Sequence, residues 1–479
     1  MNRSESLADY TADRQLQKSL GPIMLWGLGV GYVISGEYFG WNLGLIEGGT
    51  YGMLFAFVLI TIMYVAFVFS YTELACAIPR AGGVFVYGLR GLGHYGGFMG
   101  GVAQLVEFVF APPAIAMAIG AYASTWLPGV DPRYPALVAF GLFTLLNVWG
   151  VKQAATFELI VTILAVGELL LFTGVMIPHF EVKNFTANAW PNGWSGAFAA
   201  IPFAIWFYLA IEGVANAAEE SRHPQRDVPR GFGAALITLI ILALAVFVVA
   251  VGVGGWERIV YAPENLQLDG EGIQVASEAE PLDSPLPLAL GQRFEASHPL
   301  YHLLIGVGGL GLIASLNGII LIAGRAIFEM GRFGYIPRLF GSAHVRTHTP
   351  IAALLLNLVI GAFSILLLPT GKLITMSAMG AATLYIISMI TLLRLRKLEP
   401  DLERPYRTPV YPLLPIIAMV IAIIALACML WENLFNAGDL RDIMSWASSI
   451  TVWYVSFLVI ASLAFVLLIR PTLQSKQVP

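Results

Sequence analysis

Long apolar runs, separated by short polar segments, dominate the chain. Twelve of these runs reach or approach the roughly 20 apolar residues that a helix needs to span a bilayer. The pattern therefore predicts an all-α polytopic membrane protein with twelve transmembrane helices, which places both termini on the same side. The runs cover residues 20–46, 50–73, 97–126, 134–150, 154–178, 197–217, 232–254, 300–324, 351–369, 373–393, 410–431 and 450–469.

The overall composition agrees with this pattern. Of the 479 residues, 58% are hydrophobic and 12% are charged, whereas soluble domains carry roughly 45–50% and about 25%. These values exclude a soluble enzyme and a disordered chain, and a net charge of −4 offers no basic surface for nucleic acid. Cys76 and Cys428 have no disulfide or metal-binding spacing, and the polar first 19 residues do not resemble a secretory signal.

Positive charges divide unequally between the two sides of the predicted helices. With the N-terminus inside, 20 of the 26 Lys and Arg residues fall on inner segments, so the positive-inside rule predicts cytoplasmic termini. We expect a multi-pass protein of a cell membrane, such as a bacterial inner membrane. One outer segment, 255–298, holds eight acidic and two basic residues. It could concentrate cations at an outer mouth, or it is a solvated, weakly ordered loop.

Carboxylates are the only charged groups deep within the predicted helices, and such groups are functional candidates. Without internal Lys or Arg, they must be protonated or meet a mobile cation, which favours a cationic substrate, a proton relay, or both. Alternatives remain for three of them. Glu158 lies near the inner interface and could be structural, and Glu168 could be neutral and hydrogen-bonded. Glu107 shares a helix face with Gln104, and this face either lines a cavity or does not. The carboxylates are Glu37, Glu107, Glu158, Glu168 and Glu212.

Two of the predicted helices contain interruptions. The first reads GLGVGYVISGEYFGW over 27–41, and its glycines predict a break at Ser35-Gly36-Glu37 or else a close-packing face. The sixth is interrupted near Glu212 by polar residues and Gly213. Interrupted helices at the first and sixth positions indicate an inverted repeat of five helices each, which binds substrate between the broken helices.

Several motifs resemble the amino acid–polyamine–organocation (APC) superfamily of permeases. They are the glycine-rich first helix, ELACAIPRAGGVFVYGLRGLG at 73–93, EGVANAAEESRHPQRDVPRG at 212–231, NGIILIAGRAIFEMGRFGYIPRLF at 317–340 and RPYRTPVYP at 404–412. The resemblance implies a five-plus-five inverted-repeat fold, with helices 1 and 6 broken, in which helices 1, 2, 6 and 7 rock against 3, 4, 8 and 9. The expected units are a cytoplasmic segment 1–19, a first repeat 20–178, an extracellular loop 179–196, a second repeat 197–394, and helices 11 and 12 with a cytoplasmic tail over 395–479.

The stretch WFYLAIEGVANAAEES is most similar to the ethanolamine permease branch. Amino acid permeases typically read Gly-Ser-Gly-Ile in helix 1, where free amides meet the substrate carboxylate, but here Glu37 follows Ser35-Gly36 and would repel a carboxylate. We therefore expect a secondary active transporter that imports a small organic amine, with ethanolamine favoured and an amino acid permease or exchanger as the alternative. The predicted substrate-binding residues are Gly31, Ile34, Ser35, Gly36, Glu37, Gln104, Glu107, Trp206, Tyr208, Ala210, Glu212 and Gly213.

The coupling ion, proton or sodium, stays open, as do exchange and uniport. Ser315, Asn317 and Glu168 are the candidates for contacting it. A channel or sensor on the same scaffold is a competing class, and so is a membrane enzyme. No nucleophile cluster or cofactor motif supports an enzyme, and His344 and His348 lack the nearby carboxylates of a metal site.

Overall fold

The structure is a computed structural model that describes residues 20–80, 82–149, 154–269, 272–344, 347, 349–435 and 449–471. The expected N-terminal segment 1–19, most of the C-terminal tail and His348 lie outside the described residues.

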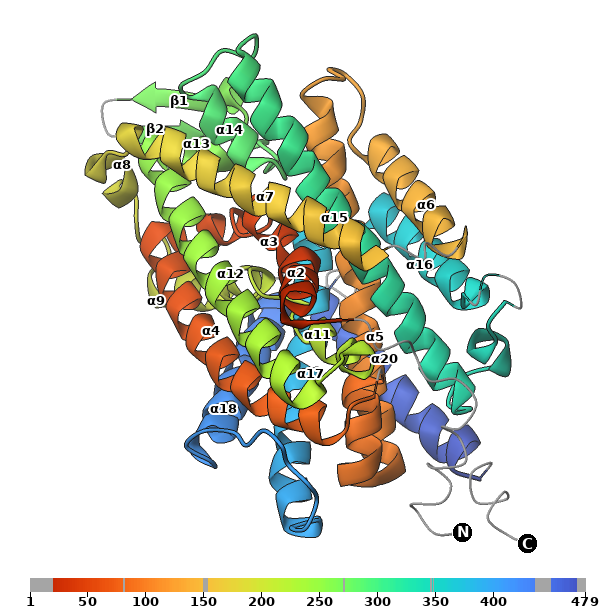
Figure 1. Cartoon of the computed structure of the whole chain (residues 1–479). Helices are drawn as coiled ribbons and strands as arrows, with labels where there is room; N and C mark the ends of the chain where they lie inside the picture. The colour runs from red at the N-terminus through yellow and green to blue at the C-terminus, as the bar shows by residue number, and fades with distance from the viewer. Residues whose placement is uncertain are drawn as a thin grey trace, which may run out of the picture.

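Helices make up most of the described chain, and each predicted apolar run contains helix (Figure 1). The first half comprises α2 (Pro22–Val33), α3 (Ser35–Tyr38), α4 (Leu43–Ala77), α5 (Gly83–Ser124), α6 (Arg133–Trp149), α7 (Ala154–Met176), η2 (Ile177–His179), α8 (Val182–Thr186), α9 (Gly193–Ala199), α10 (Ile201–Trp206), α11 (Gly213–Asn216), η3 (Ala218–Glu220) and α12 (Pro224–Gly254). The second half comprises α13 (Glu257–Val260), η4 (Pro263–Asn265), β1 (Leu266–Asp269), β2 (Gly272–Val275), α14 (Pro285–Gly291), α15 (Pro299–Arg332), η5 (Arg338–Gly341), α16 (Ile351–Leu367), α17 (Thr370–Leu398), α18 (Leu413–Phe435), α20 (Ile450–Ala464) and η6 (Phe465–Ile469).

Eight helices in the described part of the chain are long and apolar enough to cross a membrane. The other four predicted spans fall short for two reasons. The first and sixth are divided into shorter helices, whereas α6 and α16 have only 17 residues each. Each of the twelve predicted spans therefore contains helix, but eight of them, within the described residues, are long and apolar enough to cross a membrane.

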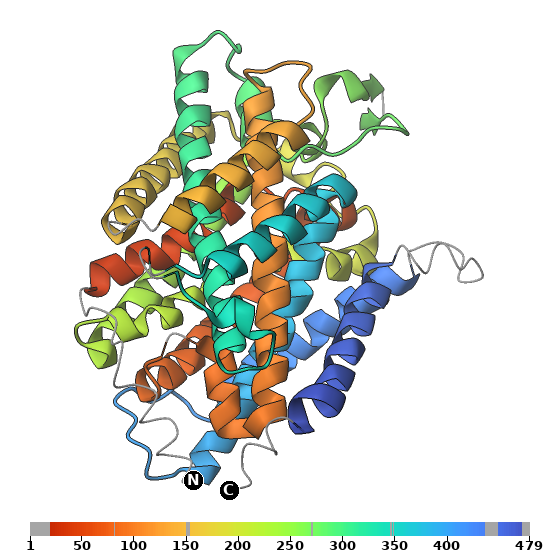
Figure 2. The ribbon, with the colours of Figure 1, turned by 90° about the vertical axis from the view of Figure 1, so that its right-hand side faces the viewer.

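The helices form one bundle around a buried core. α5 packs along α17 and α15 in its centre, α2 packs against α12 and α7, and α18 and α20 lie together at one flank (Figure 2). A sharp bend at Gly49, with a φ of 60°, divides α4 at a point between the first and second predicted spans. The glycine is needed there because a Cβ atom would clash with Pro191 at 2.4 Å.

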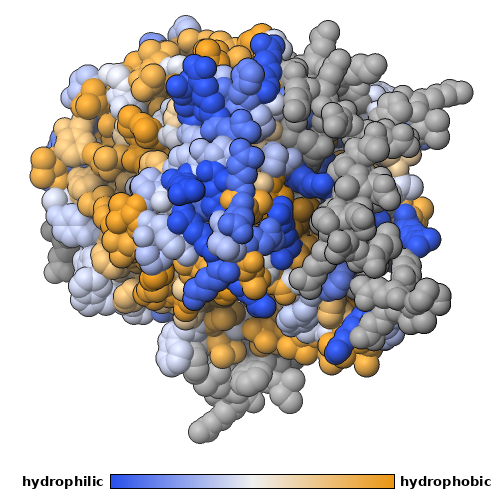
Figure 3. Space-filling model, turned by 60° about the horizontal axis from the view of Figure 1, so that its bottom comes forward, coloured by the Kyte–Doolittle hydropathy of each residue, from blue (hydrophilic) through white to orange (hydrophobic). Residues whose placement is uncertain are grey.

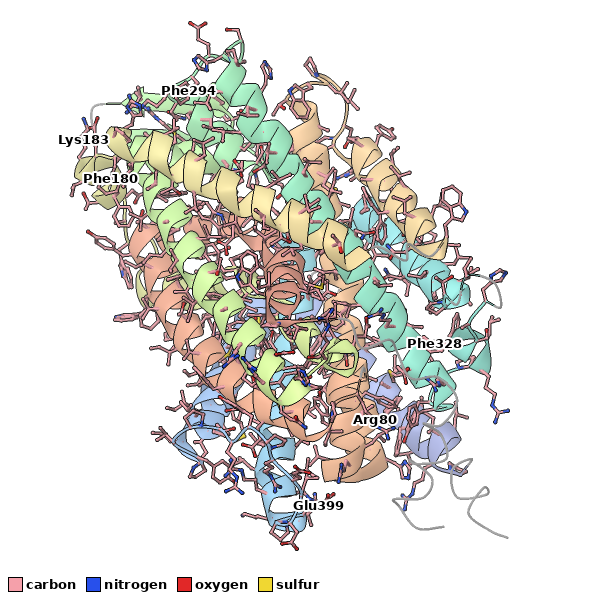
Figure 4. The ribbon with its side chains drawn as sticks, viewed as in Figure 1. Arg80, Phe180, Lys183, Phe294, Phe328 and Glu399 are labelled. Atoms are coloured by element: carbon pink, nitrogen blue, oxygen red, sulfur yellow. The ribbon has the colours of Figure 1, made fainter. Side chains whose placement is uncertain are left out.

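The two ends of the bundle differ in character. The hairpin end carries the antiparallel pair β1 and β2 together with α13 and α14 (Figure 1). The described residues of the segment 255–298, predicted as an acidic outer loop, form short helices and this hairpin there. The opposite end, which we call the arginine end, carries Arg80 and Glu399 (Figure 4). Hydrophilic side chains gather near the middle of that face, with hydrophobic residues around them (Figure 3).

Candidate substrate and ion site

The first helix is interrupted by a side chain from α15. Ser315 Oγ accepts a hydrogen bond from the Ser35 amide at 3.1 Å and donates one to the Gly31 carbonyl at 2.6 Å. These are the amide and carbonyl that a regular helix would join directly. The inserted hydroxyl separates α2 from α3, which is one of the recognised causes of a helix break.

The wider opening in the first helix lies a few residues beyond the predicted Ser35-Gly36-Glu37 break. Those three residues form a single helical turn, and Phe39 is then extended while Gly40 has a φ of 89°. Asn42 stabilises this segment, because its side chain accepts a hydrogen bond from the Gly40 amide at 3.0 Å.

The sixth helix is also broken, as predicted, between α10 and α11. Residues 207–212 form successive turns, and Ala210 has a φ of 74°, which is unfavourable for a residue with a Cβ atom. Glu107 of α5 stabilises this conformation, because its Oε1 accepts a hydrogen bond from the Ala210 amide at 3.2 Å. Polar side chains from outside the helix therefore bind backbone amides at both breaks.

The breaks of helices 1 and 6 pack closely against each other. A Cβ atom on Gly36 would lie 2.4 Å from the Trp206 carbonyl oxygen, and one on Gly40 would lie 2.5 Å from the Trp206 ring. Phe39 packs edge-on against Trp206, with their ring centroids 5.4 Å apart. Gly213 contacts Tyr32 in the same interface. Glycine is required at 36 because the two backbones approach so closely, and at 40 because of its φ of 89° and the adjacent Trp206 ring.

Three carboxylates surround these breaks without a fixed cation. Glu37 and Glu107 are 0% exposed and Glu212 is 2% exposed. Among the described residues, none of the three forms an ion pair. Neither carboxyl oxygen of Glu37 has a hydrogen-bond partner among those residues. Such groups must be neutral or must bind a mobile cation.

Tyrosine side chains connect these carboxylates to α4 and α17. The Tyr385 hydroxyl donates to Glu212 Oε2 at 3.3 Å, and it lies 2.8 Å from the Tyr64 hydroxyl. Tyr208 hydrogen-bonds Thr61 of α4 at 2.7 Å, and its ring lies 4.9 Å from that of Tyr64. Sequence reasoning included Tyr208 but missed Tyr64 and Tyr385, because no local pattern links α4 or α17 to helix 6.

The coupling-ion candidates do not meet at one place. Ser315 lies at the helix 1 break, but Asn317 pairs with Asn147 of α6, with the Asn147 Nδ2 atom 2.9 Å from Asn317 Oδ1. Glu168 accepts a hydrogen bond from the Tyr38 hydroxyl at 2.6 Å. Within the described residues, no group of three or more His, Cys, Asp or Glu side chains could hold a metal ion.

Glu158, which its position near Lys152 predicts to lie near the inner interface, packs against another helix in the structure. It is only 3% exposed, and its Oε1 lies 2.6 Å from the position that a Cβ on Gly31 would occupy. Glu158 therefore packs against helix 1 close to Ser315. The spacing of Glu158 and Thr162 on one helix face, together with the glycines of helix 1, was the available signal.

The remaining predicted residues line the surroundings of the breaks. Ile34 is the single residue between α2 and α3. Gln104 lies about one turn from Glu107, towards the arginine end. A Cβ atom on Gly83 would lie 3.6 Å from Gln104 Nε2 and 2.7 Å from Asn216 Oδ1. The whole arrangement can bind a small cation through carboxylates and enclose it with aromatic rings.

Comparisons with known proteins agree with this architecture. Residues 20–461 match the family described as amino acid permease. An uncharacterized transporter of Rhizobium meliloti is 28% identical over 433 residues, covering 88% of each chain. A branched-chain amino acid permease of Bacillus subtilis is 25% identical over 90% of this chain and 93% of its own. A low-affinity putrescine importer of Escherichia coli is 25% identical over 81% and 84%. The chain therefore belongs to the amino acid permease family of the APC superfamily and is a multi-pass membrane transporter.

Proposed function

We propose that this transporter imports a small organic amine, with ethanolamine as the first candidate, and that the ammonium group binds at the paired breaks of helices 1 and 6. The observation that carries the proposal is the set of fully buried carboxylates there, Glu37, Glu107 and Glu212, with no ion-pair partner among the described residues. A mobile cation would satisfy these groups, whereas an anion would meet only repulsion.

The helix 1 break favours an amine over an amino acid. A substrate carboxylate would need free backbone amides, but the Ser35 amide is bonded to Ser315 and the Glu37 amide to the Ile34 carbonyl at 3.0 Å. The Glu37 carboxylate lies in the same turn. The close contact between Gly36 and Trp206 further favours a small substrate.

The proposed roles follow from these positions. Glu37 or Glu212 would hold the ammonium, and Gln104 or Glu107 would bind the hydroxyl of ethanolamine. Trp206 or Tyr208 would close over the cation, which is worth about 0.5–2 kcal/mol. Transport by alternating access would move helices 1, 2, 6 and 7 against 3, 4, 8 and 9.

The orientation and internal symmetry are part of the same proposal. The arginine end would face the cytoplasm, because Lys and Arg concentrate there. Residues 20–178 and 197–394 would be the two inverted repeats, and 179–196 would be extracellular. The hairpin connection, which we define as residues 255–298, would cover the outer face.

An amino acid permease or exchanger is the second candidate. The relative named as a branched-chain amino acid permease favours it, whereas the relative named as a putrescine importer favours an amine. Both names describe those proteins, and substrate competition would separate the two possibilities for this chain.

Uptake of radiolabelled ethanolamine into proteoliposomes tests the proposal. Excess ethanolamine or putrescine should inhibit uptake, while leucine should not, with and without sodium. Glu37→Gln and Glu212→Gln should each lower kcat/KM at least about tenfold, because a charge-assisted hydrogen bond contributes roughly 1.5–3 kcal/mol. Glu280→Gln, an exposed carboxylate in the hairpin connection, is the matched control and should transport normally. Inhibition by leucine alone, or unchanged uptake in both buried variants, would reject an amine carrier of this kind.

A further inference from the structure

Glu107 and Glu212 belong to different parts of the bundle and meet at the helix 6 break. Glu107 comes from the middle of α5, and Glu212 immediately precedes α11. Both carboxyl groups are buried at this break and interact electrostatically with each other. Figure 1 shows α5, α11 and α17 close together in the bundle, and α5 also contacts α11 and α17 directly.

Two of the four carboxyl oxygens already accept hydrogen bonds, which leaves the other two as candidates for a proton. Glu107 Oε1 accepts from the Ala210 amide, and Glu212 Oε2 accepts from the Tyr385 hydroxyl. The two remaining oxygens, Glu107 Oε2 and Glu212 Oε1, have no hydrogen-bond partner among the described residues. An ionised carboxylate only accepts hydrogen bonds, so a hydrogen bond between these two oxygens would need a proton on one of them.

We propose that Glu107 and Glu212 form a proton-binding site, which shares one proton between Glu107 Oε2 and Glu212 Oε1 and carries it across the membrane together with the substrate. This inference rests on the proposed function, because it names the coupling ion of the same site. It assigns coupling to a pair of carboxylates rather than to Ser315, Asn317 or Glu168.

The surroundings of the pair contain hydroxyl groups and, among the described residues, no charged partner. Tyr64 and Tyr71 of α4 and Tyr385 of α17 lie within electrostatic reach of both carboxyl groups. Neutral tyrosines cannot balance two buried negative charges. A mobile positive charge, such as a proton or the substrate ammonium, is therefore needed to change the charge balance at the pair during transport.

The proton would also determine whether the static and rocking groups of helices can pack together at this point. Glu107 lies on the static group of helices in the proposed mechanism, and Glu212 lies on the rocking group. With one proton, the pair is a hydrogen bond across the interface; without it, two carboxylates repel each other in a low-dielectric site. Closure around the substrate therefore requires the proton, which is the physical basis of coupling.

Proteoliposomes containing a trapped pH dye test the coupling. Wild type should move about one proton per ethanolamine, and Glu280→Gln should do the same. Glu107→Gln should reduce the ratio to near zero, because the glutamine Oε1 still accepts from Ala210 while its Nε2 donates to Glu212 and replaces the proton. A ratio near zero in wild type, or near one in Glu107→Gln, would overturn the inference and leave amine transport standing.

Infrared spectroscopy provides a readout that does not depend on transport. A shared proton predicts that one component of the protonated-carboxyl absorption at neutral pH is lost in Glu107→Gln and equally in Glu212→Gln, with no further loss in the double variant. Two independent components, one lost in each single variant, would overturn the shared proton. Because no substrate is needed, this result stands whether or not ethanolamine is the substrate.

Discussion

At the scale of single residues, Ala210 shows how a distant side chain stabilises an unfavourable backbone. Its φ of 74° costs about 1–2 kcal/mol for a residue with a Cβ atom, and the Glu107 carboxyl holds its amide in place. Ala210→Gly should therefore raise the free energy of unfolding by about 1 kcal/mol, measured as a higher Tm in detergent.

Ala204 provides the control for this prediction, because it is buried within helical α10. Ala204→Gly should lower the free energy of unfolding by about 1 kcal/mol, as glycine does in a helix interior. If both variants lower Tm alike, the backbone at Ala210 is not strained.

At the scale of elements, the hairpin connection links the helix 1 break to the start of α17. The Asn42 side chain donates to the Leu282 carbonyl at 2.9 Å, and the Thr370 hydroxyl donates to Asp283 Oδ2. Thr370 is the first residue of α17. The connection is therefore docked on two elements near the site, rather than being the weakly ordered loop that its composition permitted.

Docking of this connection should depend on pH through Asp283. Burial raises the pKa of Asp283 to about 6, while the Thr370 hydrogen bond acts in the opposite direction. The docked state thus holds the proton more tightly than the undocked state. Docking is strongest below the ordinary pKa of 3.8 and weakens by up to about tenfold per pH unit until pH reaches about 6.

Hydrogen exchange of residues 279–290, corrected for intrinsic rates, measures this effect. Wild type should be up to about tenfold more protected at pH 5 than at pH 7.5. Asp283→Asn should give equal protection at both values, because asparagine still accepts from Thr370 but does not titrate. Protection that is independent of pH in wild type would contradict a role for Asp283.

The hydrophobic pattern could predict the elements because apolar length and helix breakers are local properties. The positions of the helical runs, the break in helix 6 and the buried carboxylates all came from such signals. The break in helix 1 lies where it does because Ser315, far away in sequence, inserts its hydroxyl. The hydrogen-bond partners of Glu212 likewise depend on packing between helices, which no local pattern contains.

At the scale of the whole molecule, alternating access requires the arginine end to open, and one charge cluster joins α4 to α17 there. Glu73 is 1% exposed and binds Arg396 through two hydrogen bonds of 2.6 and 2.8 Å. Arg404 Nε lies 3.3 Å from the same carboxylate, and the Thr408 amide and hydroxyl donate to it. The cluster therefore ties a helix of the rocking group to α17, which packs along the static α5.

Glu73→Gln should loosen this end, because a neutral amide leaves two arginines without their counter-charge and breaking a buried ion pair is strongly unfavourable. Cys76, one turn along α4 and only 4% exposed, is a native reporter of opening. With Cys428 changed to Ser, maleimide should label Cys76 at least about tenfold faster in Glu73→Gln than in wild type.

Glu399→Gln is the control. It breaks the Arg90–Glu399 pair at the same end, where both side chains are about one-third exposed. That pair joins α17 to α5, neither of which belongs to the rocking group, so its loss should change labelling less than about twofold. Equal acceleration in both variants would mean that general weakening of this end, and not separation of α4 from α17, exposes Cys76.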